Sequence, residues 1–376
     1  APSTPPPETD PTTDSEPSRA HIVAKKRARR DDEGMRWDPV VVTGKVVDAD
    51  GGAPIPGALV LLTPKSFEGG VAEDGQRAEP VYATTDAGGG FSLRSVPPGR
   101  YTISASASGF LTASQRKLQL RAATAPPPIA LSLARGGYPV SGTVEDVSGG
   151  PIEGALVAVT RLDDENVLSF DRSPAGVLCD DEGRFELTLA SGTYIAAISH
   201  PDYVAATETF EVVEGPRALR IQMTPGSVVE GVVRVRGGEE PVPGAVVVAS
   251  ADAAVQGAGG FTVRGFGEHR VVTDARGRFR LSGLPSGIVQ LTAVASEHAS
   301  AEETEVSLGI AQTMSDVMVW VEPAFSISGF VVPDGAEEDE GIEGVWVGAL
   351  SLRPPGLFVA RRPSEADGYF EIPGVQ

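Results

Sequence analysis

Short stretches of alternating apolar and polar residues recur along this chain, and turn-forming residues separate them. The alternation is clear at Phe91 and Leu93, and again at Tyr101, Ile103 and Ala105. A period of two residues is typical of a β-strand with one face packed inward, whereas a helix repeats every 3.6 residues. Turn signals at intervals of about 8–12 residues bound these stretches. The pattern therefore predicts an all-β chain with little helix.

One pattern of strands is repeated four times. Each copy opens with an alternating strand built around a glycine, and the three intervals between these glycines are 98, 89 and 98 residues. The four opening glycines are Gly44, Gly142, Gly231 and Gly329. A turn and a second strand follow each of them, with Gly-to-Gly offsets of 13, 12, 13 and 15 residues. Self-similarity at a fixed period indicates a tandem array of one structural unit.

A third landmark in every copy is an acidic residue, then glycine three positions later, then phenylalanine two positions after that. This spacing predicts a tight turn in which the carboxylate accepts hydrogen bonds from turn N–H groups and glycine supplies a positive φ. The phenylalanine then begins the next strand facing the core. The residues given this structural role are Asp86, Gly89, Asp180, Gly183, Asp274, Gly277, Glu365 and Gly368.

The spacing predicts tandem antiparallel β-sandwiches of about seven strands, with one face of each sheet packed inward and the other facing water. The predicted divisions are a disordered linker over 1–38, sandwich repeats over 39–135, 136–225 and 226–322, and a truncated repeat over 323–376. Short joints at Arg135–Gly137, Pro225–Gly226 and Glu322–Pro323 restrict movement between the repeats, although glycine leaves a hinge. The fourth repeat stops before its last glycine turn, so we expect further repeats or domains after Gln376. The first residue is not Met, so we expect either that a targeting or anchor segment preceded Ala1 or that the chain is an excised piece of a longer protein.

The amino-terminal segment has too few apolar residues to form a hydrophobic core. Residues 1–17 consist largely of Pro, Thr, Ser, Asp and Glu, a composition typical of an extended, disordered spacer. A basic block over Lys25–Arg30 is followed at once by three acidic residues. The block could contact an anionic partner, but its acidic neighbours favour a solvated linker.

The order of these signals resembles the carboxypeptidase regulatory-like domain. The pattern is V-x-G-x-V, then P-G-A-x-V, then T-D-x-x-G-x-F, then L-P-x-G; the third copy matches it best through Gly231, Pro243–Ala245, Thr273–Phe279 and Leu284–Gly287. The resemblance covers about 39–376 and implies a transthyretin-like (prealbumin-like, Ig-like) seven-stranded sandwich. It also implies a module that is not itself catalytic and that accompanies secreted peptidases, outer-membrane receptors and surface proteins.

Composition excludes several functional classes. The chain of 376 residues has a formal charge of −20 and a pI near 4.6, which argues against a nucleic-acid partner. A single cysteine, Cys179, cannot form a disulfide framework or a Cys-rich zinc site. No apolar run approaches the roughly 18 residues that span a membrane. The sequence predicts no membrane span in this chain and no cofactor.

Residues that could carry chemistry are scattered. The four histidines lie one per region, at His21, His200, His269 and His298, without ligand spacing, so no metal and no catalytic residue is predicted. Cys179 occupies the position of Thr85, Thr273 and Ser364 and is interpreted as a small strand residue. One acid per turn does not supply the six to eight oxygens of a calcium site, so turn capping is favoured.

The B-type repeats of collagen adhesins, a related family, form a self-made isopeptide bond between Lys and Asn. Lys45 occupies the corresponding strand, but its counterparts are Thr143, Val232 and Phe330. The only asparagine, Asn166, belongs to another unit. The crosslink is therefore not expected, and the intact mass should equal the sequence mass.

The variable loops between the second strand and the acidic turn are the predicted binding surface, because loops on a rigid sandwich carry specificity. Phe261, Arg264, Phe266 and Arg270 are the candidate contacts. We expect a non-catalytic scaffold, a rod of modules in an exported protein of the bacterial cell envelope (periplasm or cell surface). Its partner would be a protein or glycan at the loop ends. One alternative is a carbohydrate-binding module, although Trp320 and Trp346, which could stack on sugars, lie in predicted strands where core packing is favoured. Another is the accessory region of a peptidase or outer-membrane receptor whose active domain lies outside this chain.

Overall fold

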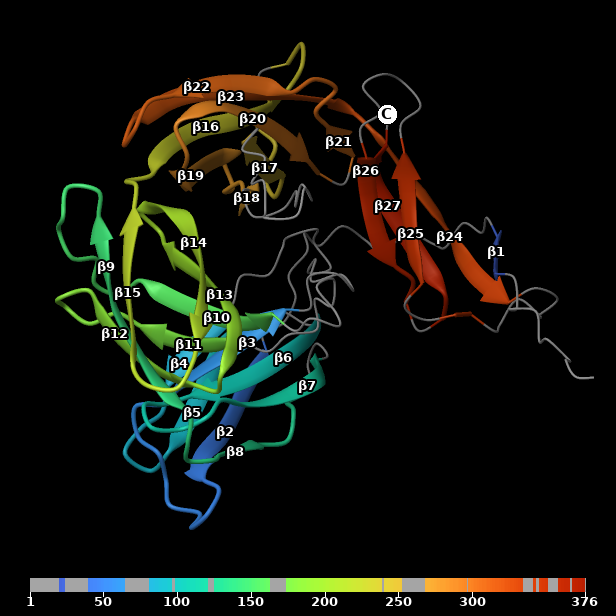
Figure 1. Cartoon of the computed structure of the whole chain (residues 1–376). Coiled ribbons are helices and arrows are strands. Elements are labelled where there is room, and N and C mark those ends of the chain that lie inside the picture. The colour runs from blue at the N-terminus through green and yellow to red at the C-terminus, as the bar shows by residue number, and fades with distance from the viewer. Residues whose placement is uncertain are drawn as a thin grey trace, which may run out of the picture.

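The computed structural model of the chain is built of β-strands, and its described residues include no helix (Figure 1). The described residues are 20–23, 40–64, 81–96, 99–120, 125–162, 174–238, 240–251, 268–295, 297–333, 341–342, 345–350, 358–365 and 367–375. The predicted disordered tail before Ala20 lies outside them. No helix that could cross a membrane occurs within these ranges. The prediction of an all-β chain of tandem sandwiches is confirmed.

The first unit has seven strands in two sheets. One sheet has the order β5 (Gly90–Val96), β2 (Val40–Asp48) and β8 (Ile129–Leu133). The other has the order β4 (Val81–Thr84), β3 (Leu59–Pro64), β6 (Gly99–Ser106) and β7 (Ala113–Leu120). Their inner faces enclose a core that includes Val42, Val60, Leu93, Tyr101 and Ile103. The opening strand β2 is thus the centre of its sheet.

The second and third units repeat this arrangement. In the second unit, the three-stranded sheet has the order β12 (Arg184–Leu189), β9 (Tyr138–Asp146) and β15 (Arg217–Met223). Its four-stranded sheet has the order β11 (Ala175–Leu178), β10 (Leu156–Leu162), β13 (Gly192–His200) and β14 (Tyr203–Val212). In the third unit, the three-stranded sheet has the order β19 (Arg278–Leu284), β16 (Ser227–Val235) and β23 (Thr313–Pro323). Its four-stranded sheet has the order β18 (Glu268–Val272), β17 (Val246–Ala251), β20 (Gly287–Val294) and β22 (Thr304–Leu308). A short strand, β21 (His298–Ala299), joins the two sheets of the third unit.

The closing strand of each unit runs parallel to the opening strand, although every other strand pair within the three units is antiparallel. The parallel pairs are β2 with β8, β9 with β15 and β16 with β23. Parallel neighbours need a crossover connection, and here the chain crosses to the four-stranded sheet before it returns. Alternation and turn residues do not distinguish strand direction, so the sequence predicted antiparallel pairing throughout.

The recurring glycine of the opening strand makes room for two neighbours. A Cβ atom at Gly231 would lie 2.2 Å from the carbonyl oxygen of Val317 and 2.7 Å from the ring of Phe279. Gly44 and Gly142 have the same surroundings, with Phe91 and Phe185 as the rings. The phenylalanine of the acidic-turn motif is therefore the cross-strand partner of the glycine, which explains why the two recur together.

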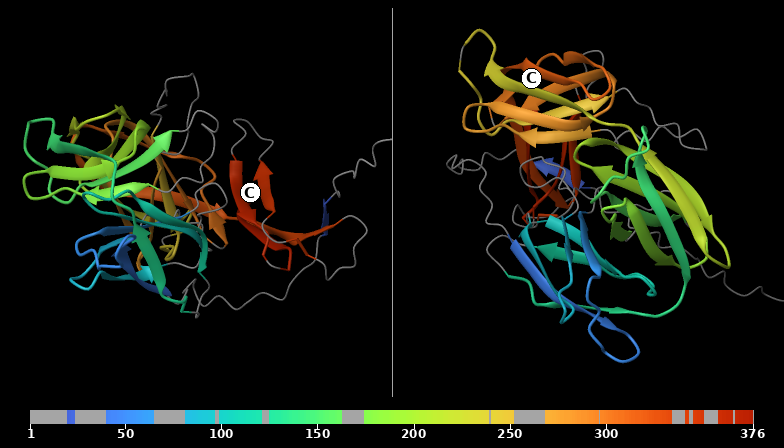
Figure 2. Two further views of the ribbon diagram at one scale, coloured as in Figure 1. Left: turned by 60° about the horizontal axis from the view of Figure 1, so that its bottom comes forward. Right: turned by 90° about the vertical axis from the view of Figure 1, so that its left-hand side faces the viewer.

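The first two units pack side by side through the outer faces of their four-stranded sheets (Figures 1 and 2). Leu59 and Leu61 of β3 form a cluster with Leu156 of β10, and Leu61 is 1% exposed. The Ser104 hydroxyl donates to the carbonyl of Pro174 at 2.7 Å across the same boundary. The expectation that the outer face of each sheet meets water is therefore wrong for this pair, because its leucines are buried by the neighbouring unit.

The later junctions are also held by backbone contacts. Between the second and third units, the N–H of Gly226 donates to the carbonyl of Asp202 at 2.8 Å. Between the third and fourth, the N–H of Ala324 donates to Glu297 at 2.8 Å. At both junctions, the connecting peptide is thus tied to a residue between two strands of the preceding unit. The short joints predicted from the sequence restrict the units more tightly than their glycines suggest.

The fourth unit has two small sheets. β24 (Phe325–Pro333) pairs with β27 (Tyr369–Val375), and β25 (Trp346–Leu350) pairs with β26 (Phe358–Pro363). The other edge of β24 pairs with β1 (Ala20–Val23), which comes from the segment for which the sequence predicts no fold. Figure 1 shows β1 in blue beside the orange-red β24. This pairing joins the two ends of the chain.

Candidate functional site

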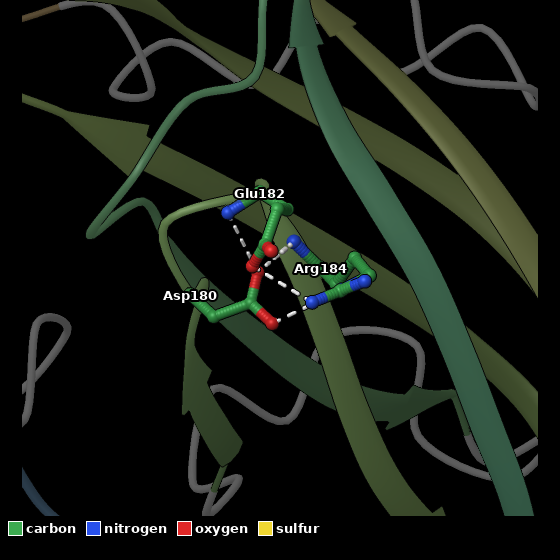
Figure 3. Close-up of polar contacts among 3 residues, drawn as sticks. All are labelled: Asp180, Glu182 and Arg184. Carbon is green, nitrogen blue, oxygen red and sulfur yellow. Dashed lines mark hydrogen bonds and ion pairs between the residues drawn. The ribbon is translucent and has the colours of Figure 1, made fainter.

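The acidic turns of the second and third units are bonded in the same way. In the second unit, Oδ1 of Asp180 accepts the N–H groups of Glu182 at 3.1 Å and Arg184 at 2.7 Å (Figure 3). The Arg184 side chain donates to Oδ2 of Asp180 at 3.2 Å and to Glu182 at 2.7 Å. In the third unit, Asp274 accepts the N–H groups of Arg276 and Arg278 at 2.8 and 2.9 Å. Each carboxylate therefore closes its turn.

The first and fourth units keep the turn without the arginine. Oδ1 of Asp86 accepts the N–H groups of Gly88 and Gly90, both at 2.8 Å. In the fourth unit, the N–H of Glu365 donates to the carbonyl of Tyr369, and the N–H of Gly368 donates to the carbonyl of Glu365. The four turns thus share backbone geometry and differ in the side chains that surround the acid.

The glycine of each turn lies directly against the opening strand. Gly89, Gly183, Gly277 and Gly368 have φ values of 71°, 71°, 70° and 77°, in the region that favours glycine. The carbonyl of each accepts a hydrogen bond from a valine of the opening strand at 2.8 Å. A Cβ atom at Gly183 would lie 2.5 Å from the carbonyl oxygen of Val144. The glycine is therefore required both for the turn and for its contact with that strand.

A buried hydroxyl before the acid was not recognised as structural from the sequence. The Thr273 hydroxyl donates to the carbonyl of Val242 at 2.8 Å and accepts the N–H of Ala245 at 2.9 Å. Thr85 bonds Ile55 and Ala58 in the same way. Ser364 makes the corresponding two bonds in the fourth unit. The shared Thr, Thr and Ser at one repeat position was the signal that could have revealed this role.

Cys179 holds that position in the second unit. Its backbone pairs with Gly154 and Ala155 at 3.0 and 2.9 Å, as the backbones of Thr85 and Thr273 pair in their units. The side chain is 5% exposed within the core of the unit. Burial, with a contribution from Asp180, raises the pKa of the Cys179 thiol to about 12. A thiol in this environment is protonated at neutral pH and is a poor nucleophile.

Three exposed carboxylates gather at the second turn, where Asp180, Asp181 and Glu182 can bring an oxygen each to within 4.8 Å of one another. Arg184 already binds two of them (Figure 3). Its backbone N–H, followed by its side chain, lowers the pKa of Asp180. The neighbouring Asp181 side chain raises the pKa of Glu182. The Arg184 guanidinium therefore already neutralises part of the charge of these carboxylates, and the hydrogen bonds are those of a turn closed by its first carboxylate.

The candidate binding loops fall largely outside the described residues. Phe261, Arg264 and Phe266 belong to 252–267, between β17 and β18, which the structure does not describe. Arg270 is described: it is half-buried on β18, opposite Val248 of β17. The role of the four residues in binding stays a prediction. Of the other variable loops, 65–80, 163–173 and 351–357 also lie outside the described residues.

His21 belongs to β1, and the other three histidines lie in three separate places. His200 accepts the N–H of Asp202 at 3.2 Å and meets the ring of Tyr203 edge-on. Burial lowers the pKa of His269 in β18. His298 belongs to β21, where it pairs with Pro323. The structure therefore keeps the three imidazoles in different strands.

Trp320 differs from the sequence-based expectation. Its position in a predicted strand favoured core packing, but its side chain is 37% exposed on β23. It lines a shallow hollow with Arg236 and Gly237. The Arg236 guanidinium forms ion pairs with Glu302 at 3.1 Å and Glu322 at 2.9 Å. Alternation places Val319 and Val321 in the core and Trp320 on the outer face.

Comparison with known proteins gives one family. The model of the carboxypeptidase regulatory-like domain matches three successive segments, 41–133, 139–224 and 228–319. Comparison with curated protein sequences gives no match.

Solved structures give more distant similarities. The chain is similar to the Bacillus anthracis TIE protein, with 15% identity and a TM-score of 0.22; the match covers 75% of this chain and half of that protein. It is similar to a streptococcal ancillary pilin, with 12% identity and a TM-score of 0.29, over 75% of this chain and 99% of the pilin. A minor pilin of Streptococcus agalactiae matches with 14% identity and a TM-score of 0.28, over 50% of this chain and 96% of the pilin. Identities and scores at this level assign no role to the chain.

Proposed function

Because this chain belongs to the carboxypeptidase regulatory-like domain family, we propose that it is a non-catalytic structural and interaction module. It would hold variable loops on a rigid array of β-sandwiches in an exported protein of the bacterial cell envelope. The observation that supports this most directly is that the sandwich is built three times around complete cores, with each junction tied by hydrogen bonds.

The residues that recur support a structural use. The acids of the first three turns, the turn glycines, and the hydroxyls of Thr85, Thr273 and Ser364 bind backbone groups of their own unit, so they maintain the fold. The segments that vary between units, such as 65–80 and 252–267, connect neighbouring strands of the four-stranded sheets. A rigid scaffold that presents variable connections is suited to recognition rather than to chemistry. The partner we propose is an envelope protein.

A loop exchange tests this proposal. Residues 252–267 are replaced by a Gly-Ser linker of equal length, and 65–80 are replaced in the same way as the matched control. Binding of immobilised chain to an isolated bacterial envelope fraction is measured by interferometry. We expect the 252–267 variant to lose binding, the control to keep it, and protease treatment of the fraction to abolish it. Failure of the unaltered chain to bind the fraction would contradict the proposal.

A carbohydrate-binding role is the second candidate, because Trp320 is exposed beside the hollow that Arg236 lines. Sugars stack on exposed aromatic rings, and charged groups beside the ring can bind hydroxyls. Binding that survives protease but is lost after periodate oxidation of the envelope fraction would favour this role. Trp320→Ala should then abolish it, whereas Met318→Ala on the same strand should not.

A further inference from the structure

The open edge of the fourth unit is occupied by a segment from the other end of the chain. In the first unit, the closing strand β8 pairs with Gly44–Asp48 of the opening strand. The repeat alignment makes Gly329–Pro333 the corresponding stretch of β24. β1 pairs with Phe330–Pro333, so it occupies nearly the same part of the same edge. The described residues of the fourth unit include no parallel closing strand of the kind seen in β8, β15 and β23.

The backbone of β24 offers hydrogen bonds on that edge. The N–H of Val331 donates to Gly368, and its carbonyl accepts the N–H of Ile342, so both groups point away from β1. Because successive residues of a strand point their polar backbone groups to opposite sides, those of Phe330 and Val332 point toward β1. The register pairs Val332 with His21 and Phe330 with Val23. These two pairs are therefore hydrogen-bonded, and the intervening pair of Ile22 with Val331 is not.

Leaving this edge bare would be costly. Val331 packs in the core cluster of the fourth unit with Phe370 and Ile372, and Val332 beside it is 5% exposed, so the paired stretch of β24 is apolar. An uncovered strand edge with apolar side chains is a template for pairing with other chains. Addition of one strand to such an edge is a common mode of segment recognition.

We propose that the edge of β24 over Phe330–Pro333 is a strand-accepting site whose occupant is Ala20–Val23 of the same chain. The segment runs antiparallel to β24 on the edge where the closing strands of the other three units run parallel to their opening strands. It fastens the amino-terminal segment to the fourth unit and closes the chain into a loop. This inference does not depend on the proposed function, because it concerns only the pairing of β1 with β24.

Proline substitution at two adjacent positions tests the pairing. His21→Pro removes the N–H that points at Val332, so the strand should detach. Ile22→Pro is the matched control, because the N–H of Ile22 points away from β24 and proline is tolerated there. Hydrogen exchange at the amides of Phe330 and Val332 should be about tenfold faster or more in His21→Pro and unchanged in Ile22→Pro. Equal exchange in the unaltered chain and His21→Pro would overturn the proposal.

A disulfide trap tests the register and the occupant. Ile22 and Val331 form a non-hydrogen-bonded pair, in which Cα atoms lie about 4.5 Å apart, within the range a disulfide accepts. Ile22→Cys with Val331→Cys should oxidise to a monomer with a closed loop, seen in non-reducing gels and by intact mass. Ile22→Cys with Ile327→Cys is the off-register control, about 13 Å out of register along the strand. Buried Cys179 does not compete. A disulfide-linked dimer, or equal yields from the two pairs, would contradict the proposal.

Discussion

Gly226 lies directly against Gly283: a Cβ atom placed at Gly226 would be 2.5 Å from the Cα atom of Gly283. The contact joins the start of the third unit to β19, and Gly283 in turn faces the carbonyls of Pro201 and Tyr203 of the second unit. The glycine at this joint, which in the sequence suggests a hinge, instead permits close packing of two backbones. The junction is therefore fixed by contact.

Gly226→Ala should destabilise this junction. The added methyl group must displace the backbone at Gly283, and overpacking of this kind costs about 1–3 kcal/mol. We expect that loss in the free energy of unfolding measured in urea. Gly150→Ala is the matched control, because no atom lies within 4 Å of the position its Cβ would take. An equal effect of the two substitutions would show that the junction is not close-packed.

Cys179→Thr should stabilise the second unit. The threonine hydroxyl would recreate the bridge that Thr85 and Thr273 make in their units, and a net intramolecular hydrogen bond contributes about 1 kcal/mol. Cys179→Val has a similar size without the hydroxyl and should give no such gain. In the reverse direction, Thr273→Val should cost about 1–3 kcal/mol, because it leaves buried backbone groups without their partner. Thermal unfolding of the three variants checks the order.

The Cys179 thiol should be unreactive in the folded chain. Its pKa is raised to about 12 by burial, so the thiolate that attacks disulfide reagents is scarce at pH 8. Titration with a coloured aromatic disulfide should release no thiol equivalent in buffer and one equivalent in denaturant. Rapid release of one equivalent from the folded chain would contradict the burial of this residue.

Acid should weaken the turn of the third unit through Asp274. The N–H groups of Arg278 and Arg276, and then the Arg278 side chain, lower its pKa below the ordinary value of 3.8. A group whose pKa is lowered on folding stabilises the fold above its unfolded pKa, and that stabilisation is lost as pH falls through the folded pKa. The loss is therefore expected below about pH 4.

Asp274→Asn should remove this part of the pH dependence. Its unfolding free energy should fall less steeply than that of the unaltered chain between about pH 4 and pH 2. Thr273→Val, in the same turn, is the control: it has no titrating group and should lower stability by the same amount at every pH. Parallel profiles for Asp274→Asn and the unaltered chain would show that Asp274 does not contribute.

Local signals were sufficient to predict much of the fold. Alternation identified the strands, and the spacing of Asp180, Gly183 and Phe185 identified a turn whose carboxylate and glycine make the expected backbone contacts. Such features depend on residues close in sequence. The sequence did not show why glycine recurs in the opening strand, because the ring and the carbonyl it accommodates come from strands far along the chain.

The contacts between units and the exposed aromatic residue were not predictable in the same way. In the alternating pattern, Leu59 and Leu61 occupy the positions that would face water in an isolated unit, and the neighbouring unit buries them. Trp320 follows the alternation onto the outer face of β23, whereas its position in a predicted strand had favoured core packing. β1 has no strand pattern of its own, since its pairing depends on the edge that β24 offers. Each case is decided by tertiary surroundings.

The leucine cluster shared by the first two units limits which fragments of the chain can be produced as stable proteins. A fragment ending near Arg135 would uncover Leu59 and Leu61, and a fragment beginning near Gly136 would uncover Leu156. Either fragment would expose an apolar patch to solvent, so it would self-associate or need detergent to remain monomeric. The smallest fragment of this region that keeps the leucine cluster buried therefore contains the first and second units together, and biophysical experiments are best done on that pair.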